Sequence, residues 1–165
     1  MAARTTRGGL QLLKIAHFCC IALWMGGVAA LLPILAAVEY GDTQNAVARY
    51  LALRSVAWNV IGWGGIGTVT TGVALAALSD WGLFRHRWVI MKLVAAPALV
   101  LFGMFFVEKH MLANLELLKD AAATGDLHAV HRRVQGGLLL MLGGFIGIIA
   151  LSVVKPWSRV STGRS

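Results

Sequence analysis

Four long runs of apolar residues, separated by short polar segments, dominate the pattern of this chain. The runs cover residues 13–38, 57–78, 88–107 and 136–154 and contain few charged side chains. Each is long enough to form a helix that crosses a bilayer, which takes about 20 predominantly apolar residues. The pattern predicts an all-α fold: an integral membrane four-helix bundle that forms a single transmembrane domain over residues 1–165.

The polar segments between the runs contain helix signals of their own. Asp42 follows a glycine and is typical of a helix start, which predicts a short helical approach to the second span, and Asp126 gives a similar signal. Residues 108–135 carry leucines at helical spacing among charged side chains. We therefore expect the third helix to continue beyond the bilayer as an extramembrane helical extension, and a short second helix to return to the fourth span.

The composition supports membrane insertion. The 165 residues are 58% hydrophobic and 13% charged, whereas soluble domains are about 45–50% apolar and about 25% charged. The net charge of +8 comes from Lys and Arg residues placed singly or in pairs between the apolar runs. This arrangement excludes a nucleic-acid interface, which would need a basic stripe with interleaved aromatics. The expected partner is the lipid bilayer.

The distribution of basic residues predicts the orientation. The N-terminal segment resembles a signal peptide, but its apolar run is longer than a signal sequence needs, so we expect a retained first span. Lys and Arg are more numerous at the N-terminus, in the second loop and in the tail than in the first loop, although the third loop carries Lys109, Lys119, Arg132 and Arg133. The positive-inside rule then favours a bacterial-type cytoplasmic membrane with both termini in the cytoplasm.

Glycines and cysteines in the spans have plain structural explanations. Gly62, Gly64 and Gly67 match G-x-G-x-x-G, but the match lies inside one apolar span and lacks the strand that a dinucleotide site requires. Small residues every four positions, Gly64–Thr68–Gly72 and Gly143–Gly147, instead predict close helix packing. Cys19 and Cys20 are adjacent on one helix and cannot form an ordinary disulfide.

Two ionisable residues inside the spans are candidates for function, because charge is costly in a membrane. The neutral imidazole of His17 can be an axial ligand of b-type haem iron, and Trp24 and Gly27 lie on the same side of its helix, where they could line and admit the ring. The alternative is a histidine that hydrogen-bonds a neighbouring helix. Met25 or Met91 could supply a sixth ligand, although methionine in a membrane helix usually serves packing.

Lys92 lies about one turn inside the third span, at a depth similar to that of His17 if every helix crosses once. The lysine could extend its ammonium group to the headgroups. Alternatively it could pair with carboxylates of a substrate or haem, or act as a base when desolvated. The sequence therefore permits His17 and Lys92 to share a site.

The third loop carries a second group of histidines. His128 and His131 have a usable metal spacing on a helix, and His110 and Glu108 are near in sequence. The neighbouring arginines suit an ordinary polar surface equally well. The role of these histidines stays open at this point.

Three short segments carry a resemblance to a known family. The stretch from Lys14 and His17 to Trp24 and Gly27, the start of the third span at Lys92, and the closing Lys155-Pro156-Trp157 resemble the HemJ-type protoporphyrinogen oxidases and the related CopD-type copper-resistance proteins. The HemJ-type pattern has an Arg and a further His where this chain has Pro33, Ile34 and Val38, and another His where it has Gly103 and Met104. The resemblance therefore implies a divergent member.

The resemblance implies a four-helix membrane protein that binds haem b through His17, with Lys92 in a functional role, and that exchanges electrons with a tetrapyrrole or a quinone. If it is an enzyme, it is a membrane oxidoreductase of the protoporphyrinogen-oxidase type. Two alternatives stay open. One is a CopD-like copper-handling protein with Met25, Met91, Met104 and the loop histidines as ligands. The other is a non-catalytic subunit that packs into a homo-oligomer or a larger membrane complex.

Overall fold

The computed structural model describes residues 7–79, 83–84, 86–119 and 124–154, and every element over these ranges is a helix. In chain order the elements are α1 (Arg7–Ala36), α2 (Thr43–Val56), η1 (Ala57–Gly62), α3 (Trp63–Leu78), α4 (Arg87–Phe102), η2 (Gly103–Val107), α5 (Glu108–Leu117) and α6 (Thr124–Val154). The segments η1 and η2 are π-helical. Each joins the α-helices on either side of it into one continuous rod.

Four helices are long and apolar enough to cross a membrane, which confirms the expectation from the four apolar runs. They are Arg7–Ala36, Thr43–Leu78, Arg87–Leu117 and Asp126–Val154. The first has 30 residues, or about 45 Å at 1.5 Å per residue. The hydrocarbon core of a bilayer is about 30 Å thick, so the rods are longer than a bilayer core requires.

The polar segments differ in part from the expectation. Asp42 caps α2, since its side chain accepts a hydrogen bond from Asn45 N at 3.1 Å, and α2 leads directly into the second long helix, as predicted. The continuation of the third helix as α5 is also confirmed. The separate short return helix is wrong: α6 runs without a break from Thr124 to Val154. The Gly136-Gly137 pair does not end the helix, because a glycine inside a helix costs only about 1 kcal/mol.

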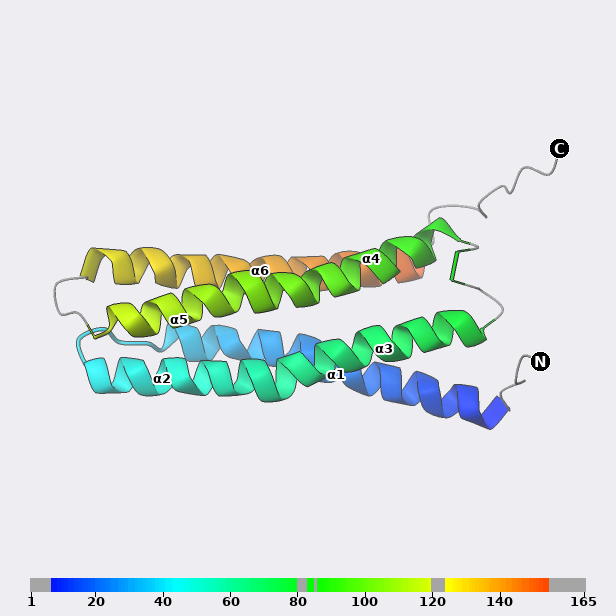
Figure 1. Ribbon diagram of the computed structural model, residues 1–165, viewed down its shortest axis with the longest axis horizontal. Coiled ribbons are helices and arrows are strands. Elements are labelled where there is room, and N and C mark those ends of the chain that lie inside the picture. The colour runs from blue at the N-terminus through cyan, green and yellow to red at the C-terminus, as the bar shows by residue number, and fades with distance from the viewer. Residues whose placement is uncertain (1–6, 80–82, 85, 120–123, 155–165) are drawn as a thin grey trace.

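The four rods lie side by side along most of their length (Figure 1). The start of α1, the end of α3, the start of α4 and the end of α6 lie at one end, which we call the α1-start end. The end of α1, the start of α2, the end of α5 and the start of α6 lie at the other, the α2-start end. Residues far apart in sequence therefore meet at each end.

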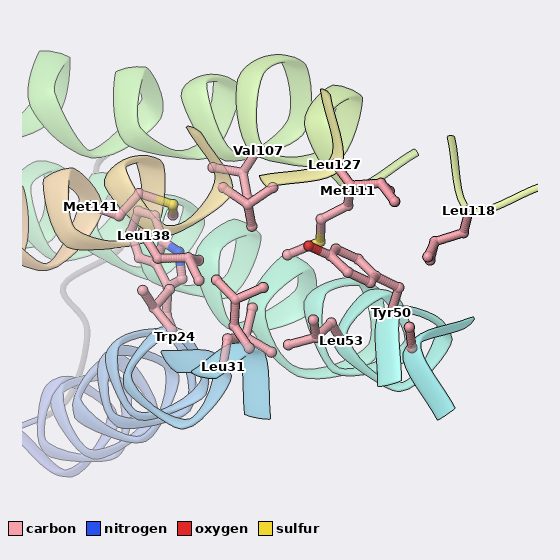
Figure 2. Packing of buried hydrophobic residues seen from close by; sticks show 14 of the residues in the cluster. Trp24, Leu31, Tyr50, Leu53, Val107, Met111, Leu118, Leu127, Leu138 and Met141 are labelled. Atoms are coloured by element: carbon pink, nitrogen blue, oxygen red, sulfur yellow. The ribbon is translucent and has the colours of Figure 1, made fainter. Parts of the chain in front are cut away.

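The core is denser toward the α2-start end. Figure 2 shows the larger buried cluster, in which Leu31, Tyr50, Leu53 and Met111 converge from three of the rods. Toward the α1-start end the buried cluster contains only Ala76, Trp88 and Val89 among the described residues. This second half is loosely filled, which leaves room for a cavity.

The outer faces of the rods are apolar. Phe18 is 68% exposed, Trp63 69%, Phe105 70% and Val153 75%. Isolated exposed apolar residues are normal on soluble proteins, but a surface of this kind on all four rods is typical of helices that face lipid.

The closest helix approach is between α1 and α3. A Cβ atom added to Gly64 would lie 2.8 Å from the backbone nitrogen of Trp24, and one added to Gly72 would lie 3.1 Å from His17 Cε1. The predicted packing role of the α3 stripe is therefore confirmed. The α6 stripe is a correction: an added Cβ on Gly143 or Gly147 meets nothing within 4 Å among the described residues. Its neighbour Gly144 makes the contact instead, against Leu99 of α4, because one position along a helix turns the side chain by about 100°.

We predict that Gly64→Ala destabilises the protein by about 1–3 kcal/mol, because the new methyl group meets backbone that cannot move aside as a flexible side chain can. Gly143→Ala is the matched control, since its methyl group enters open space. The free energy of unfolding in detergent micelles, followed by circular dichroism, measures both. Equal stability of the two variants would contradict the packing assigned to Gly64.

Candidate functional site: two cavities between the helices

The larger cavity has a volume of about 650 Å³ and lies between α1, α3, α4 and α6 in the loosely packed half of the structure. We call it the His17 cavity. Pockets that hold small molecules and cofactors usually measure about 300–1,000 Å³. The residues that line it include His17, Trp24, Thr68, Trp88, Lys92 and Ser152. The structure thus places His17 and Lys92, from two different helices, around one space.

A hydrogen bond to α3 holds the His17 ring. Its Nδ1 atom lies 2.8 Å from Thr71 Oγ1, and the Thr71 hydroxyl donates to the carbonyl oxygen of Gly67. A hydroxyl has a single proton, so a Thr71 hydroxyl that donates to Gly67 can only accept at His17 Nδ1, and this pairing corresponds to the tautomer with the ring proton on Nδ1. Nε2 of this tautomer has a lone pair. An imidazole fixed in this way through its other nitrogen is the usual arrangement of a metal-binding histidine.

Of the two residues expected beside His17, Trp24 lines the His17 cavity and Gly27 does not. Trp24 lines the cavity and is only 2% exposed, with its ring edge-on to Phe145 at 4.7 Å between centroids. Gly27 is not among the lining residues, because it packs against η1, where an added Cβ would lie 2.7 Å from Ile61 Cγ1. The glycine that lies against the His17 ring is Gly72 of α3.

Lys92 turns toward the neighbouring helices. Its Nζ atom donates to Ser152 Oγ of α6 at 3.2 Å and lies 4.4 Å from the centroid of the Trp88 ring. The second contact is a cation–π interaction, which favours a charged ammonium. These contacts hold the ammonium group at the cavity wall.

The methionines that could bind copper or a second face of haem iron are dispersed. Met25 lines the His17 cavity and Met104 lines the other cavity, while Met91 lines neither and is 42% exposed. Met25 and His17 share one helix, about 12 Å apart along its axis, so the two cannot bind opposite faces of one iron atom. Among the described residues no three His, Cys, Asp or Glu side chains are grouped as a metal site.

The second cavity has a volume of about 360 Å³, and we call it the Glu108 cavity. Both π-helical segments, η1 and η2, contribute to its wall, and such segments occur frequently at functional sites. Its lining is apolar apart from a few groups, of which Glu108 is the only acidic one among the described residues. Trp24 lines both cavities and therefore lies between them.

The hydrogen bonds that Glu108 accepts from other described side chains all end at one oxygen, Oε1. Arg54 Nε and Nη2 donate to Oε1 at 2.8 and 2.7 Å, and Trp58 Nε1 donates to the same atom at 3.2 Å. Oε2 is buried and has no partner among the described residues. A buried acceptor without a partner is uncommon and calls for an explanation.

The loop histidines belong to a different structure, a polar cluster at the α2-start end. His131 Nδ1 lies 2.8 Å from Tyr40 Oη and 3.1 Å from Tyr50 Oη, and Asn114 Nδ2 donates to Tyr40 Oη and to the Leu127 carbonyl. Burial raises the pKa of Tyr40, so its hydroxyl stays protonated at neutral pH. His128 packs edge-on against Tyr40, and His110 bonds the Phe106 carbonyl. This cluster joins the loop between α1 and α2, where Tyr40 lies, to α2, α5 and α6 and is a structural network.

Sequence reasoning missed several side chains of these sites. Thr71 gives no signal in the sequence, because a threonine in an apolar span normally hydrogen-bonds to a carbonyl of its own helix. Thr71 also makes such a bond, to Gly67. Ser152 and Trp88 gave no signal, since their importance depends on which way α4 and α6 face. Arg54 and Glu108 are 54 positions apart. The sequence signal for this pair is that Arg54 and Glu108 each place a charge in a helix that otherwise carries few charges.

We predict that Asn114→Asp destabilises the protein by about 2–4 kcal/mol at neutral pH, because a buried carboxylate would face the Leu127 carbonyl without a proton to donate. Lowering the pH protonates the carboxyl group and restores a donor, so the loss should shrink as the pH falls. Asn45→Asp at the start of α2 is the control and should cost little at any pH. Unfolding curves at pH 4 and 7 test this, and a pH-independent loss would contradict the assigned bonds.

Comparison of the whole chain with protein-family models, with curated proteins and with solved structures finds no match.

Proposed function

We propose that this protein is a four-helix bundle of a bacterial-type cytoplasmic membrane, with both termini in the cytoplasm, that binds haem b in the His17 cavity. The four long apolar helices support membrane insertion. The distribution of Lys and Arg supports the orientation. The His17 cavity then lies toward the cytoplasmic side, because it is near the start of the first helix.

The observation that carries the haem proposal is the arrangement of His17. In the tautomer in which Nδ1–H donates its hydrogen bond to Thr71 Oγ1, Nε2 is the nitrogen that can bind iron. The cavity beside it is apolar and lined by the rings of Trp24 and Trp88, which suits a flat macrocycle. Two lysines, Lys14 and Lys92, also line the cavity and can pair with the carboxylates of haem.

Bound haem would supply reversible one-electron chemistry at iron. The residues of the chain would hold it: His17 as iron ligand, Thr71 to fix the tautomer, and Lys92 to bind a carboxylate or move a proton at Nζ. The function is then electron transfer, or oxidation of a tetrapyrrole of the protoporphyrinogen type, with a tetrapyrrole or a quinone as redox partner. An oxidoreductase activity would rest on Lys92, which lines the His17 cavity and could exchange a proton with a substrate bound there.

Two other functions are less well supported. A CopD-like copper site would need Met25, Met91 and Met104 to converge with the loop histidines, and the structure separates them between two cavities and the surface. A non-catalytic subunit, in a homo-oligomer or a larger complex, would explain the open glycine face of α6 at Gly143 and Gly147. It would not explain the fixed histidine.

We predict that protein purified from haem-replete cells shows a Soret band and sharp reduced α and β bands, and that His17→Ala abolishes them. Thr71→Val should weaken haem retention by about tenfold, since loss of a bond that orients a metal ligand typically costs about 10–100-fold in affinity. His110→Ala is the matched control, because His110 lies on α5 at the other end and lines neither cavity.

Absorption spectra of the oxidised and reduced protein measure the haem, and circular dichroism confirms that each variant is folded. A folded wild-type protein that stays colourless after haem addition would overturn the proposal. Copper analysis of that sample would then separate the copper-handling and subunit functions.

We predict that Lys92→Arg perturbs the haem spectrum or redox activity nearly as much as Lys92→Met. Arginine keeps the charge, but it remains protonated and its planar group does not reproduce a compact ammonium between Ser152 and Trp88. Lys119→Arg is the control, since Lys119 forms an exposed pair with Glu116. Full activity of Lys92→Arg would show that the lysine serves only as a membrane anchor.

The double variant sharpens this test. If His17 and Lys92 act on one bound group, adding Lys92→Arg to His17→Ala should cost little more than His17→Ala alone. Simple addition of the two losses would indicate two independent sites.

A further inference from the structure

The Glu108 cavity plays no part in the proposed haem site, and its chemistry is different. Its wall combines aromatic and aliphatic side chains with one carboxylate and the amide of Asn59, whose Nδ2 donates to the Ser55 carbonyl. Two of its tryptophans, Trp58 and Trp63, are 51% and 69% exposed on the outer face of the second rod. A molecule dissolved in the bilayer could therefore reach the cavity from the side, without passing through water.

The carboxylate determines which polar group a ligand must bring. Glu108 Oε1 already accepts three hydrogen bonds, whereas Oε2 is buried with no partner among the described residues. A carboxylate can only accept hydrogen bonds. A hydrocarbon chain in the cavity would offer Glu108 Oε2 no hydrogen-bond donor. An anionic ligand would be repelled by the negative charge of the carboxylate. The ligand should therefore carry a donor.

The charge balance selects a neutral donor. Arg54 and Glu108 form an ion pair at 2.7 Å, so their charges already cancel. An ammonium ligand would add an uncompensated positive charge in a site of low polarity, which is costly. A hydroxyl group supplies the donor without a charge. The indole rings of Trp24, Trp58 and Trp63 at the wall favour an aromatic body, since aromatic pairs attract each other beyond what their buried area alone contributes.

We propose that the Glu108 cavity binds a neutral, lipid-soluble aromatic compound that carries a ring hydroxyl group, of the hydroquinone or phenol class, and that the Glu108 carboxylate accepts the hydrogen bond of that hydroxyl. This binding does not depend on haem in the His17 cavity. The two proposals can therefore fail separately.

The test measures how strongly the protein prefers a donor on the ring. Purified protein in lipid nanodiscs is titrated with a decyl-substituted benzohydroquinone and with its dimethyl ether, which has the same body without hydroxyl protons. Saturable quenching of tryptophan fluorescence reports binding, because three of the six tryptophans line this cavity. We expect the hydroquinone to bind at least about tenfold more tightly, as befits a hydrogen bond to a charged acceptor.

Glu108→Gln should reduce that preference to nearly onefold, because the amide can donate to an ether oxygen as well as accept from a hydroxyl. Glu116→Gln on the same helix is the matched control and should keep the wild-type preference, since Glu116 pairs with Lys119 on the exposed surface. The ratio of the two affinities cancels any general effect of a substitution on the fold.

A second variant covers the case in which Glu108→Gln does not fold. Met104→Trp should fill the cavity from its exposed side while the Arg54–Glu108 pair stays intact, and it should abolish saturable quenching. His17→Ala should leave binding unchanged even if it removes haem. The proposal is overturned if the ether binds as tightly as the hydroquinone, if Glu108→Gln keeps the preference, if decanol binds as tightly as the hydroquinone, or if binding is lost in His17→Ala.

Discussion

The close contact of α1 with α3 is the constraint on which both cavities depend. Gly64 brings the α3 backbone against the backbone of Trp24, and two turns further along Gly72 meets the His17 ring. Any side chain at Gly64 would separate the helices, and Thr71 would then no longer reach His17 Nδ1. The same contact fixes Trp24, which forms part of the wall of each cavity. One pair of helices thus sets the position of the candidate iron ligand and of the partition between the two spaces.

The two halves of the molecule are packed to different densities. Toward the α2-start end, the buried cluster packs apolar side chains and the Tyr40–Tyr50–His131 network pairs polar groups from several segments, while Asn114 Oδ1 is buried with no partner among the described residues. Toward the α1-start end, few side chains are buried and the larger of the two cavities lies between the helices. A binding site needs space that a fully packed core does not leave. The dense half, whose buried side chains also border the smaller Glu108 cavity, can therefore hold the helices in register while the open half leaves room for the larger His17 cavity.

Much of the fold could be predicted from the sequence, because run length and apolar content alone decide whether a helix can span a bilayer. The similar depth of His17 and Lys92 also followed from their places in the first and third runs. What could not be predicted depends on the rotation of each helix about its axis. Thr71 faces His17, Gly144 rather than Gly143 contacts α4, and Gly27 faces η1. A shift of one residue turns a side chain by about 100°, and the apolar pattern of a lipid-facing helix does not determine that angle.

The Arg54–Glu108 pair carries an energetic cost that a bound ligand could reduce. Removing two charges from water costs several kcal/mol per ion, and a buried pair often contributes no more stability than apolar residues of the same size. Here the cost is higher, because Glu108 Oε2 lacks a partner among the described residues. Packing in this part of the structure would be served as well by leucine or methionine, both of which already occur in the wall of the Glu108 cavity. A hydroxyl donor arriving from the bilayer would give Glu108 Oε2 a hydrogen-bond partner and would leave the charge balance of the Arg54–Glu108 pair unchanged. The unsatisfied oxygen, which destabilises the protein without a ligand, would therefore stabilise the complex with one.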